Sequence, residues 1–213
     1  MTVSSKKKAY ELILQDVIRG TFAEDHNLLN ERRLIERYGI GKTPIREALV
    51  ELCNEKVLRS IPRYGYEIIT LTQQDIAEVL QVRCMLECSC LRLMAPHVTR
   101  NALLAFRGRC EEEEQVLKQA DVWEAWDSNV RVHLQLCSFA QNRYCQQMLE
   151  SSMGILKRAY AQFYLDRQRT VHKPYGNGLH MDIVDRLLAG DVDGAEAALR
   201  EDICSFEKLI FML

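Results

Sequence analysis

The chain lacks any apolar run long enough to cross a membrane. A spanning helix needs roughly 18 or more apolar residues in a row, and no stretch of the 213 residues approaches that length. The start of the sequence also lacks the short apolar segment of a secretory signal. From these absences we expect a cytoplasmic protein without a membrane partner.

A large positive charge is missing as well. The formal net charge is −2, which argues against a protein that coats nucleic acid without regard to sequence. The charge is unevenly divided, because residues 1–71 carry a net charge of +2 and the remaining residues carry −4. This mild asymmetry favours the N-terminal part as the region that meets an anionic partner.

The eight cysteines include no C-x-x-C pair and no series of metal-finger spacings. Most of them stand among apolar residues at helical spacing. We therefore interpret them as small buried hydrophobic side chains of a protein in a reducing compartment. Cys84, Cys88 and Cys90 are close enough in sequence to suggest a redox sensor, which is the alternative interpretation.

Residues 39–56, GIGKTPIREALVELCNEK, predict a helix whose start attracts an anion. Thr43 is a favourable N-cap, and Pro44 suits the first helical position because its missing N–H has no helical partner there. Lys42, Thr43 and Arg46 lie at the exposed start, where the helix dipole favours negative charge. Four apolar residues recur at the spacing of one helix face and predict a buried side; they are Ile45, Ala48, Leu49 and Leu52.

The segments around this helix complete a small domain. One helix ends at Gly20, and another begins near Asn30 and ends at Gly39. β-Branched residues on either side of Arg63-Tyr64-Gly65 predict a hairpin. Two short helices joined by a Gly-containing turn and followed by a hairpin match a winged helix-turn-helix. We expect this domain, with three helices and a small β-hairpin, to cover residues 1–71.

The rest of the chain predicts only helices. Thr72 to Asp75 resembles a capping box, which places the domain boundary after residue 71. Asp193, with Glu196 three residues later, gives an N-cap signal for the last helix. The expected fold is mainly α, with an all-α bundle of six or seven helices over residues 72–213. The expected helices cover residues 73–95, 100–119, 121–140, 143–167, 174–189 and 193–211.

The first domain has the features of a DNA reader. In a helix-turn-helix the second helix enters the major groove and its first turn meets base edges. Lys42 and Arg46 suit guanine or phosphate, Arg32 would lie near phosphate, and the hairpin tip would reach the minor groove. In the alternative, Arg46 pairs with Glu47 or Glu51 on a solvated helix face.

Four polar residues stand on helix faces that should enter the bundle; they are Asn129, His133, His180 and Asp202. A buried polar group without a partner costs roughly a few kcal/mol, so the economical arrangement brings these side chains together. Two imidazole nitrogens and one or two oxygens make a reasonable divalent metal site with open positions. A hydrogen-bonded cluster without metal explains the same pattern, and both interpretations stay open.

Residues 9–71 resemble the winged helix-turn-helix of the GntR family of bacterial transcription regulators. The similarity rests on Leu29-x-Glu31-x-x-Leu34, on GIGKTPIREAL at residues 39–49, and on Arg63-x-Gly65. The family usually has Ser-Arg where this chain has Gly41-Lys42, and a Lys cannot form the bidentate fork of an Arg. The residues assigned to DNA binding are Arg32, Gly41, Lys42, Thr43, Pro44, Arg46, Arg63, Tyr64 and Gly65.

Residues 75–213 resemble the FCD-type effector domain of the FadR subfamily. The similarity rests on Arg83-x-x-x-Glu87, on His133 followed by Ala140-Gln141-Asn142, and on His180-x-x-Ile183 leading to Gly190-Asp191. It implies a divalent metal, zinc or a similar ion, that holds a small carboxylate effector such as an organic or sugar acid. The implied ligands are Asn129, His133, His180 and Asp202.

This chain departs from the FCD pattern at two ligand positions. Asp202 stands where the family usually has His, and Asn129 stands where it often has Asp. Both changes favour a different metal or weaker binding. Arg83 is a candidate to clamp the effector carboxylate, and an ion pair with Glu87 four residues later is its alternative role.

The leading hypothesis is a homodimeric transcription regulator without enzymatic activity. Repression is the commoner outcome in the family that it resembles. Its two winged heads would read a palindromic operator in double-stranded DNA, and an effector in the bundle would alter their spacing. One alternative is a DNA-binding protein whose helical domain only dimerises. Another is a metal-dependent enzyme with an appended helix-turn-helix, for which the sequence offers no general base at motif spacing.

Overall fold

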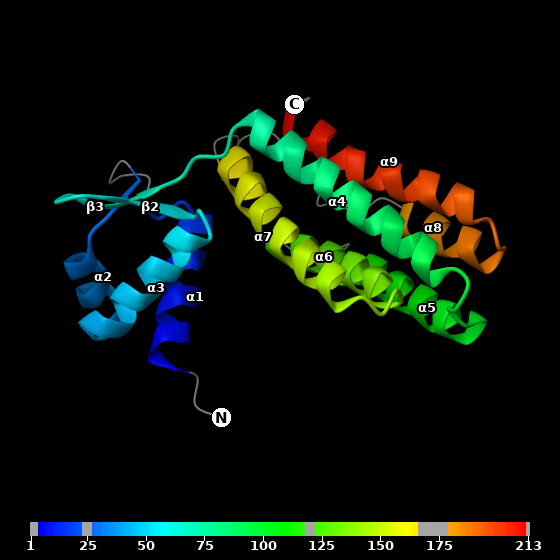
Figure 1. Ribbon diagram of the computed structural model, residues 1–213, viewed down its shortest axis with the longest axis horizontal. Coiled ribbons are helices and arrows are strands. Elements are labelled where there is room, and N and C mark those ends of the chain that lie inside the picture. The colour runs from blue at the N-terminus through cyan, green and yellow to red at the C-terminus, as the bar shows by residue number, and fades with distance from the viewer. Residues whose placement is uncertain (1–3, 23–26, 118–121, 166–178, 212–213) are drawn as a thin grey trace. The chain divides into compact units, whose positions relative to one another are not determined.

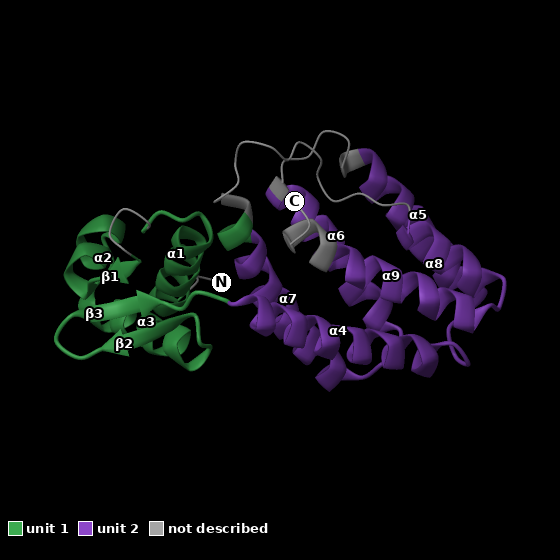
Figure 2. Cartoon of the chain, turned by 90° about the horizontal axis from the view of Figure 1, so that it is seen from above, with its two compact units in different colours: residues 1–71, 161–166 green, residues 72–160, 167–213 purple. Residues whose placement is uncertain are grey.

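The computed structural model describes residues 4–22, 27–117, 122–165 and 179–211 (Figure 1). The chain divides into two compact units (Figure 2). Unit 1 comprises residues 1–71 and 161–166, and unit 2 comprises residues 72–160 and 167–213. Among the described residues, no helix is both long and apolar enough to span a bilayer.

Unit 1 contains the predicted helices and hairpin, and one further strand. Its elements are α1 (Ser5–Ile18), β1 (Leu28–Leu29), α2 (Glu31–Tyr38), α3 (Lys42–Asn54), β2 (Leu58–Ile61) and β3 (Gly65–Ile68). The strands form one antiparallel sheet in the order β1-β3-β2, and Tyr66 of β3 pairs with Leu29 on one side and Ser60 on the other. The sequence pattern predicts only β2 and β3, because two residues are too few to show alternation.

The starts of α2 and α3 use different caps. Asn30 caps α2 as predicted, since its side-chain oxygen accepts a hydrogen bond from the N–H of Arg32 at 2.9 Å. The predicted N-cap at Thr43 is wrong, because α3 begins directly after Gly41, which is its N-cap. Pro44 therefore occupies the third helical position instead of the first. Proline is tolerated there because the first N–H groups of a helix have no intrahelical partner.

The core of unit 1 fixes the orientation of α3. The predicted buried face is confirmed, with four fully buried residues, Ile45, Ala48, Leu49 and Leu52. They pack with Ile13 of α1, Leu34 of α2 and Leu58 of β2. Full burial of one large aliphatic side chain contributes about 1.5–3 kcal/mol. This packing holds the opposite face of α3 toward solvent.

The helices that follow residue 72 agree with the predicted ones to within a few residues. They are α4 (Gln73–Met94), α5 (Arg100–Leu117), α6 (Val122–Ser138), α7 (Arg143–Leu165), α8 (Leu179–Leu188) and α9 (Val192–Phe211). The predicted ends at residues 119 and 167, and the predicted starts at residues 121 and 174, lie outside the described residues.

Two of these helix starts test the predicted caps. The capping box of α4 is confirmed, because the Thr72 N–H donates to the Asp75 carboxylate at 2.8 Å and the Asp75 N–H donates to the Thr72 hydroxyl at 3.1 Å. The predicted cap at Asp193 is wrong. Helix α9 begins at Val192, and the Asp191 carboxylate accepts a hydrogen bond from the Gly194 N–H at 2.9 Å.

Helix packing in unit 2 brings α4, α6, α8 and α9 around one interior. α4 packs against α6 and α9, and α8 packs against α5 and α9 (Figure 1). Trp126 of α6 and Phe206 of α9 are buried with ring centroids 5.4 Å apart. The polar residues predicted on the inner faces of α6, α8 and α9 therefore point into a shared interior.

Candidate nucleic-acid interface and buried polar cluster

The exposed start of α3 carries the cationic side chains predicted to meet DNA. Lys42 and Thr43 are exposed, and the Arg46 side chain is 66% exposed. Gly41 offers no side-chain cap to the first N–H groups of the helix. A surface hollow runs along α3 from this helix start to Asn54, and Lys6 of α1 also lines it. Lys42, Thr43 and Arg46 line its first part, and two carboxylates, Glu47 and Glu51, line it further along, with Glu51 2.8 Å from Lys6 Nζ. Backbone donors, helix dipole and cationic side chains thus favour an anion at the same place.

The two arginines of the helix-turn-helix each have one acidic neighbour. Arg32 Nε donates to the Glu36 carboxylate at 3.0 Å, and Arg46 Nε lies 3.8 Å from the Glu31 carboxylate. The alternative paired Arg46 with Glu47 or Glu51 of its own helix. The structure instead places it beside Glu31, which belongs to α2. Exposed ion pairs contribute about 0–1 kcal/mol, so a phosphate can compete with these carboxylates for either guanidinium.

The turn between β2 and β3 forms the wing. Tyr64 is 74% exposed and Arg63, also exposed, has a left-handed backbone with φ 71°. Gly65 has φ +126°, and a Cβ there would lie 2.3 Å from the carbonyl oxygen of Leu29. The close approach of β1 therefore requires glycine at this position, independently of any contact with DNA.

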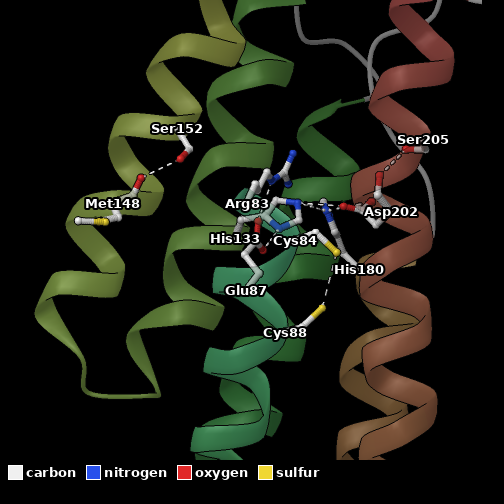
Figure 3. Close-up of polar contacts among 10 residues, drawn as sticks. All are labelled: Arg83, Cys84, Glu87, Cys88, His133, Met148, Ser152, His180, Asp202 and Ser205. Atoms are coloured by element: carbon white, nitrogen blue, oxygen red, sulfur yellow. Dashed lines mark hydrogen bonds and ion pairs between the residues drawn. The ribbon is translucent and has the colours of Figure 1, made fainter. Parts of the chain in front are cut away.

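Three of the four predicted metal ligands meet inside unit 2. His133 of α6 lies between two carboxylates, with Nδ1 2.6 Å from Glu87 of α4 and Nε2 3.0 Å from Asp202 of α9 (Figure 3). His180 Nε2 of α8 lies 3.4 Å from His133 Nε2 and 3.6 Å from the Asp202 carboxylate. Glu87, His133 and Asp202 are almost completely buried.

Arg83 adjoins this cluster through Glu87. Its Nε donates a hydrogen bond to the Glu87 carboxylate at 2.7 Å, and both side chains are at most 2% exposed. The alternative role predicted for Arg83, an ion pair with Glu87, is thus confirmed. Arg83 Nη2 has no hydrogen-bond partner among the described residues. Its role as an effector clamp stays a prediction.

The contacts reverse the effect of burial on the ionisation of the cluster. Burial by itself raises the pKa of both carboxylates. For Glu87, the charges and hydrogen bonds of His133 and Arg83 outweigh burial and lower the pKa. For Asp202, those of His133 and His180 do the same. Burial lowers the pKa of His133, but Glu87 and Asp202 outweigh it and raise that pKa. The two carboxylates therefore favour a cation between them.

The donor set also fits a divalent metal. Ligand atoms of His133, His180 and Asp202 lie within 4.8 Å of one another. Asn129 stands one turn before His133 on α6 and is buried, and within the described part of the chain neither Asn129 Oδ1 nor Asp202 Oδ1 has a hydrogen-bond partner. Two imidazole nitrogens with nearby oxygens suit zinc or a similar transition metal. A metal held by His133, His180 and Asp202 would also satisfy the unpartnered Asp202 Oδ1.

The sequence pattern assigns Glu87 only to Arg83, whereas the structure adds its contact with His133. Metal-binding histidines commonly donate their second ring N–H to a carboxylate, and Glu87 occupies that position. One local signal could have placed Glu87 inside. Arg83 and Glu87 continue the helical spacing of the apolar residues that α4 buries, which include Ile76, Leu80, Leu91 and Met94.

Comparison with known proteins gives two family matches. The family of bacterial regulatory proteins named gntR matches residues 5–68, and the FCD domain family matches residues 78–204. The chain is 28% identical over 142 residues to the uncharacterized HTH-type transcriptional regulator YdhC of Bacillus subtilis (strain 168), covering 66% of this chain and 63% of that protein. The matched segment thus spans less than two thirds of YdhC.

Two further comparisons agree with these matches. The chain is 25% identical over 168 residues to the HTH-type transcriptional repressor GlaR of Escherichia coli (strain K12), covering 74% of this chain and 73% of GlaR. The solved structure of E. coli McbR/YncC matches with a TM-score of 0.76 and 17% identity, covering 99% of each chain. At that identity the likeness shows the fold alone.

Proposed function

The chain belongs to the gntR family of bacterial regulatory proteins and carries an FCD domain, and from this premise we propose that it is a ligand-responsive, DNA-binding transcription repressor. The observation that supports this best is the exposed cationic start of α3, held outward by a buried opposite face. The two family matches are to regulators and not to enzymes, which disfavours the metal-enzyme alternative. Because bacterial DNA lies in the cytoplasm, a protein that binds it would be located there as well.

The DNA contacts come from three places in unit 1. We place Lys42, Thr43 and Arg46 against base edges and phosphate in the major groove. Arg32, whose side chain is 87% exposed, would meet phosphate at the start of α2. Exposure of these side chains supports the assignment. The wing would reach the minor groove through Arg63, Tyr64 and Gly65, while Gly41 and Pro44 shape the start of α3.

A homodimer would present two such heads to a palindromic operator, because two-fold symmetry in the protein matches two half-sites. Large apolar side chains that remain exposed in unit 2 support association with a second copy. They are Val82, Met85 and Leu93 on α4, Leu104 on α5, and Tyr144 and Met148 on α7. Sedimentation of the purified chain tests this directly, with a dimer expected at operator-binding concentrations.

The effector would bind at the buried polar cluster. His133, His180 and Asp202, with Asn129, would hold a divalent ion, and that ion would supply a positive centre for the carboxylate of an organic or sugar acid. The Glu87 carboxylate would accept a hydrogen bond from the Nδ1–H of His133 and so keep that proton on Nδ1, which leaves Nε2 to face the ion. Arg83, whose Nη2 has no partner among the described residues, would offer a second donor to the effector.

The test of DNA recognition starts from selection of a binding sequence out of a random duplex library with the full chain. Lys42→Ala and Arg46→Ala should each weaken binding and reduce the salt slope of the affinity by about one phosphate contact. Arg109→Ala, which removes an exposed charge from α5, is the matched control and should bind as the wild type does. Failure to enrich any sequence would contradict the proposed function.

A further inference from the structure

Three cysteines from three helices meet in the core of unit 2. Cys137 Sγ of α6 lies 3.1 Å from Cys90 Sγ of α4, and each residue is 1% exposed. They pack with Leu149 and Met153 of α7. Cys145, at the start of α7, is partly exposed and packs against the same cluster. The thiols therefore connect the interior of unit 2 to its surface.

This thiol pair lies one helical turn from the buried polar cluster on both helices. Cys90 follows Glu87 by three residues on α4, and Cys137 follows His133 by four residues on α6. The Glu87–His133 contact of 2.6 Å and the Cys90–Cys137 contact of 3.1 Å thus join the same two helices at successive turns. A covalent bond at the second contact would restrict movement at the first.

We propose that Cys90 and Cys137 form a reversible disulfide that locks α4 to α6, with Cys145 as the thiol that an oxidant reaches first. The two sulfurs need to approach by only about 1 Å to reach the bonding distance near 2.05 Å. The contact between the two thiols lowers the pKa of Cys137 and, together with burial, raises that of Cys90. Cys137 is accordingly the thiolate that attacks in the final exchange, which forms the Cys90–Cys137 bond.

The oxidation can be written with hydrogen peroxide as the oxidant. The Cys145 thiolate attacks one peroxide oxygen, which gives a sulfenic acid and releases water after proton uptake. Cys90 then attacks Cys145 Sγ, forming a disulfide and releasing the second water. Cys137 attacks Cys90 Sγ, and Cys145 leaves as a thiolate that takes up a proton. Two thiols lose two electrons and two protons, and one peroxide becomes two waters.

The neighbouring pair Cys84 and Cys88 offers a contrast. Their sulfurs are 4.0 Å apart on the same helix, four residues from each other. Closing that distance to a bond requires α4 to unwind locally, whereas Cys90 and Cys137 approach from separate helices. The sequence pattern places Cys84, Cys88 and Cys90 together, and the structure instead pairs Cys90 with Cys137.

The test uses the full chain with Cys204, which is exposed, replaced by serine to prevent cross-linking between copies. Peroxide treatment followed by peptide mapping should find a Cys90–Cys137 disulfide that dithiothreitol reverses. Cys84→Ser is the matched control and should keep the cross-link. Cys145→Ser should slow its formation by about tenfold or more, in proportion to the lost access. A cross-link between other cysteines, or irreversible oxidation of Cys145 with no cross-link, would overturn the proposal.

The consequence for the polar cluster rests on the proposed function and is measured separately. Cobalt titration of reduced and oxidised protein should give affinities that differ by about tenfold, the size typical of a disturbed partner of a metal ligand. Equal cobalt affinities would overturn the coupling between the thiols and the cluster. If neither form bound cobalt, the proposed metal site would fail, while the mapped disulfide would still stand or fall by itself.

Discussion

Glu87 and His133 are 46 residues apart in sequence, and their side chains lie 2.6 Å apart in the core of unit 2. The contact joins α4 to α6 and leaves the second ring nitrogen of His133 facing Asp202 at 3.0 Å. Because the Glu87 carboxylate accepts a hydrogen bond from the Nδ1–H of His133, Nε2 becomes the nitrogen available to a metal. Several expectations depend on this one hydrogen bond.

Replacing Glu87 with Gln keeps its shape and removes its charge. The neutral amide no longer fixes the His133 ring as strongly, so we expect divalent metal affinity to fall by about 10–100-fold. Competition with a chromogenic chelator measures the change. Glu78→Gln, on the exposed face of the same helix, is the control and should leave the affinity unchanged. Equal losses in both variants would contradict a specific role for Glu87.

Metal affinity should decrease as the pH is lowered. Burial alone would lower the pKa of His133, but Glu87 and Asp202 outweigh burial and raise it. The imidazole therefore keeps its proton to a higher pH than a free histidine, whose pKa is about 6.5. A metal at Nε2 must displace that proton, so binding weakens where the protonated form dominates. Cobalt titrations between about pH 6 and pH 8 check this, and an affinity independent of pH would contradict it.

Lys42→Arg restores a bidentate donor at the start of α3. A guanidinium can bond both acceptors of a guanine edge, whereas an ammonium acts as a point charge. On operators that carry guanine at the contacted position, the variant should discriminate against other bases by about 1–3 kcal/mol more than the wild type does. Binding to a set of single-base operator variants measures this. A uniform change across the set would place Lys42 at phosphate.

Gly65→Ala should destabilise unit 1. The new Cβ would lie 2.3 Å from the Leu29 carbonyl oxygen, and the backbone there has φ +126°. We expect a loss of about 1–3 kcal/mol in the free energy of unfolding, measured by urea denaturation. Gly41→Ala is the matched comparison, because a Cβ there would lie no nearer than 3.9 Å to Pro44. If both variants unfolded alike, contact with β1 would not explain the glycine.

Local patterns predict most of the helices of this chain. The apolar face of α3 follows directly from its spacing, and the Thr72 capping box needs only residues three apart. The sequence could not predict that Gly41, and not Thr43, is the N-cap of α3, because both residue types are acceptable at that position. The conformation of the backbone before the helix determines which of them caps it. Strand β1 was missed because Leu28 and Leu29 form a strand only through their pairing with β3, which is distant in sequence.

The buried cluster was predictable in part. Polar residues on apolar faces identified Asn129, His133, His180 and Asp202, because each needs a partner that the interior must supply. The contact between Glu87 and His133 depends on how α4 packs against α6, which no local spacing encodes. The same holds for Cys90 and Cys137. Long-range pairing is therefore the part of the site that the sequence leaves open.

The most direct measurement is operator affinity of the full chain with the buried cluster loaded and unloaded. Fluorescence anisotropy of a labelled operator would be recorded for protein stripped with a chelator, for protein with zinc, and for zinc-loaded protein with each of a panel of organic and sugar acids. We expect at least one acid to change operator affinity by about 5–150-fold, and the operator to change the affinity for that acid by the same factor. Identical operator affinity under every condition would contradict control of the DNA-binding head by the helical unit.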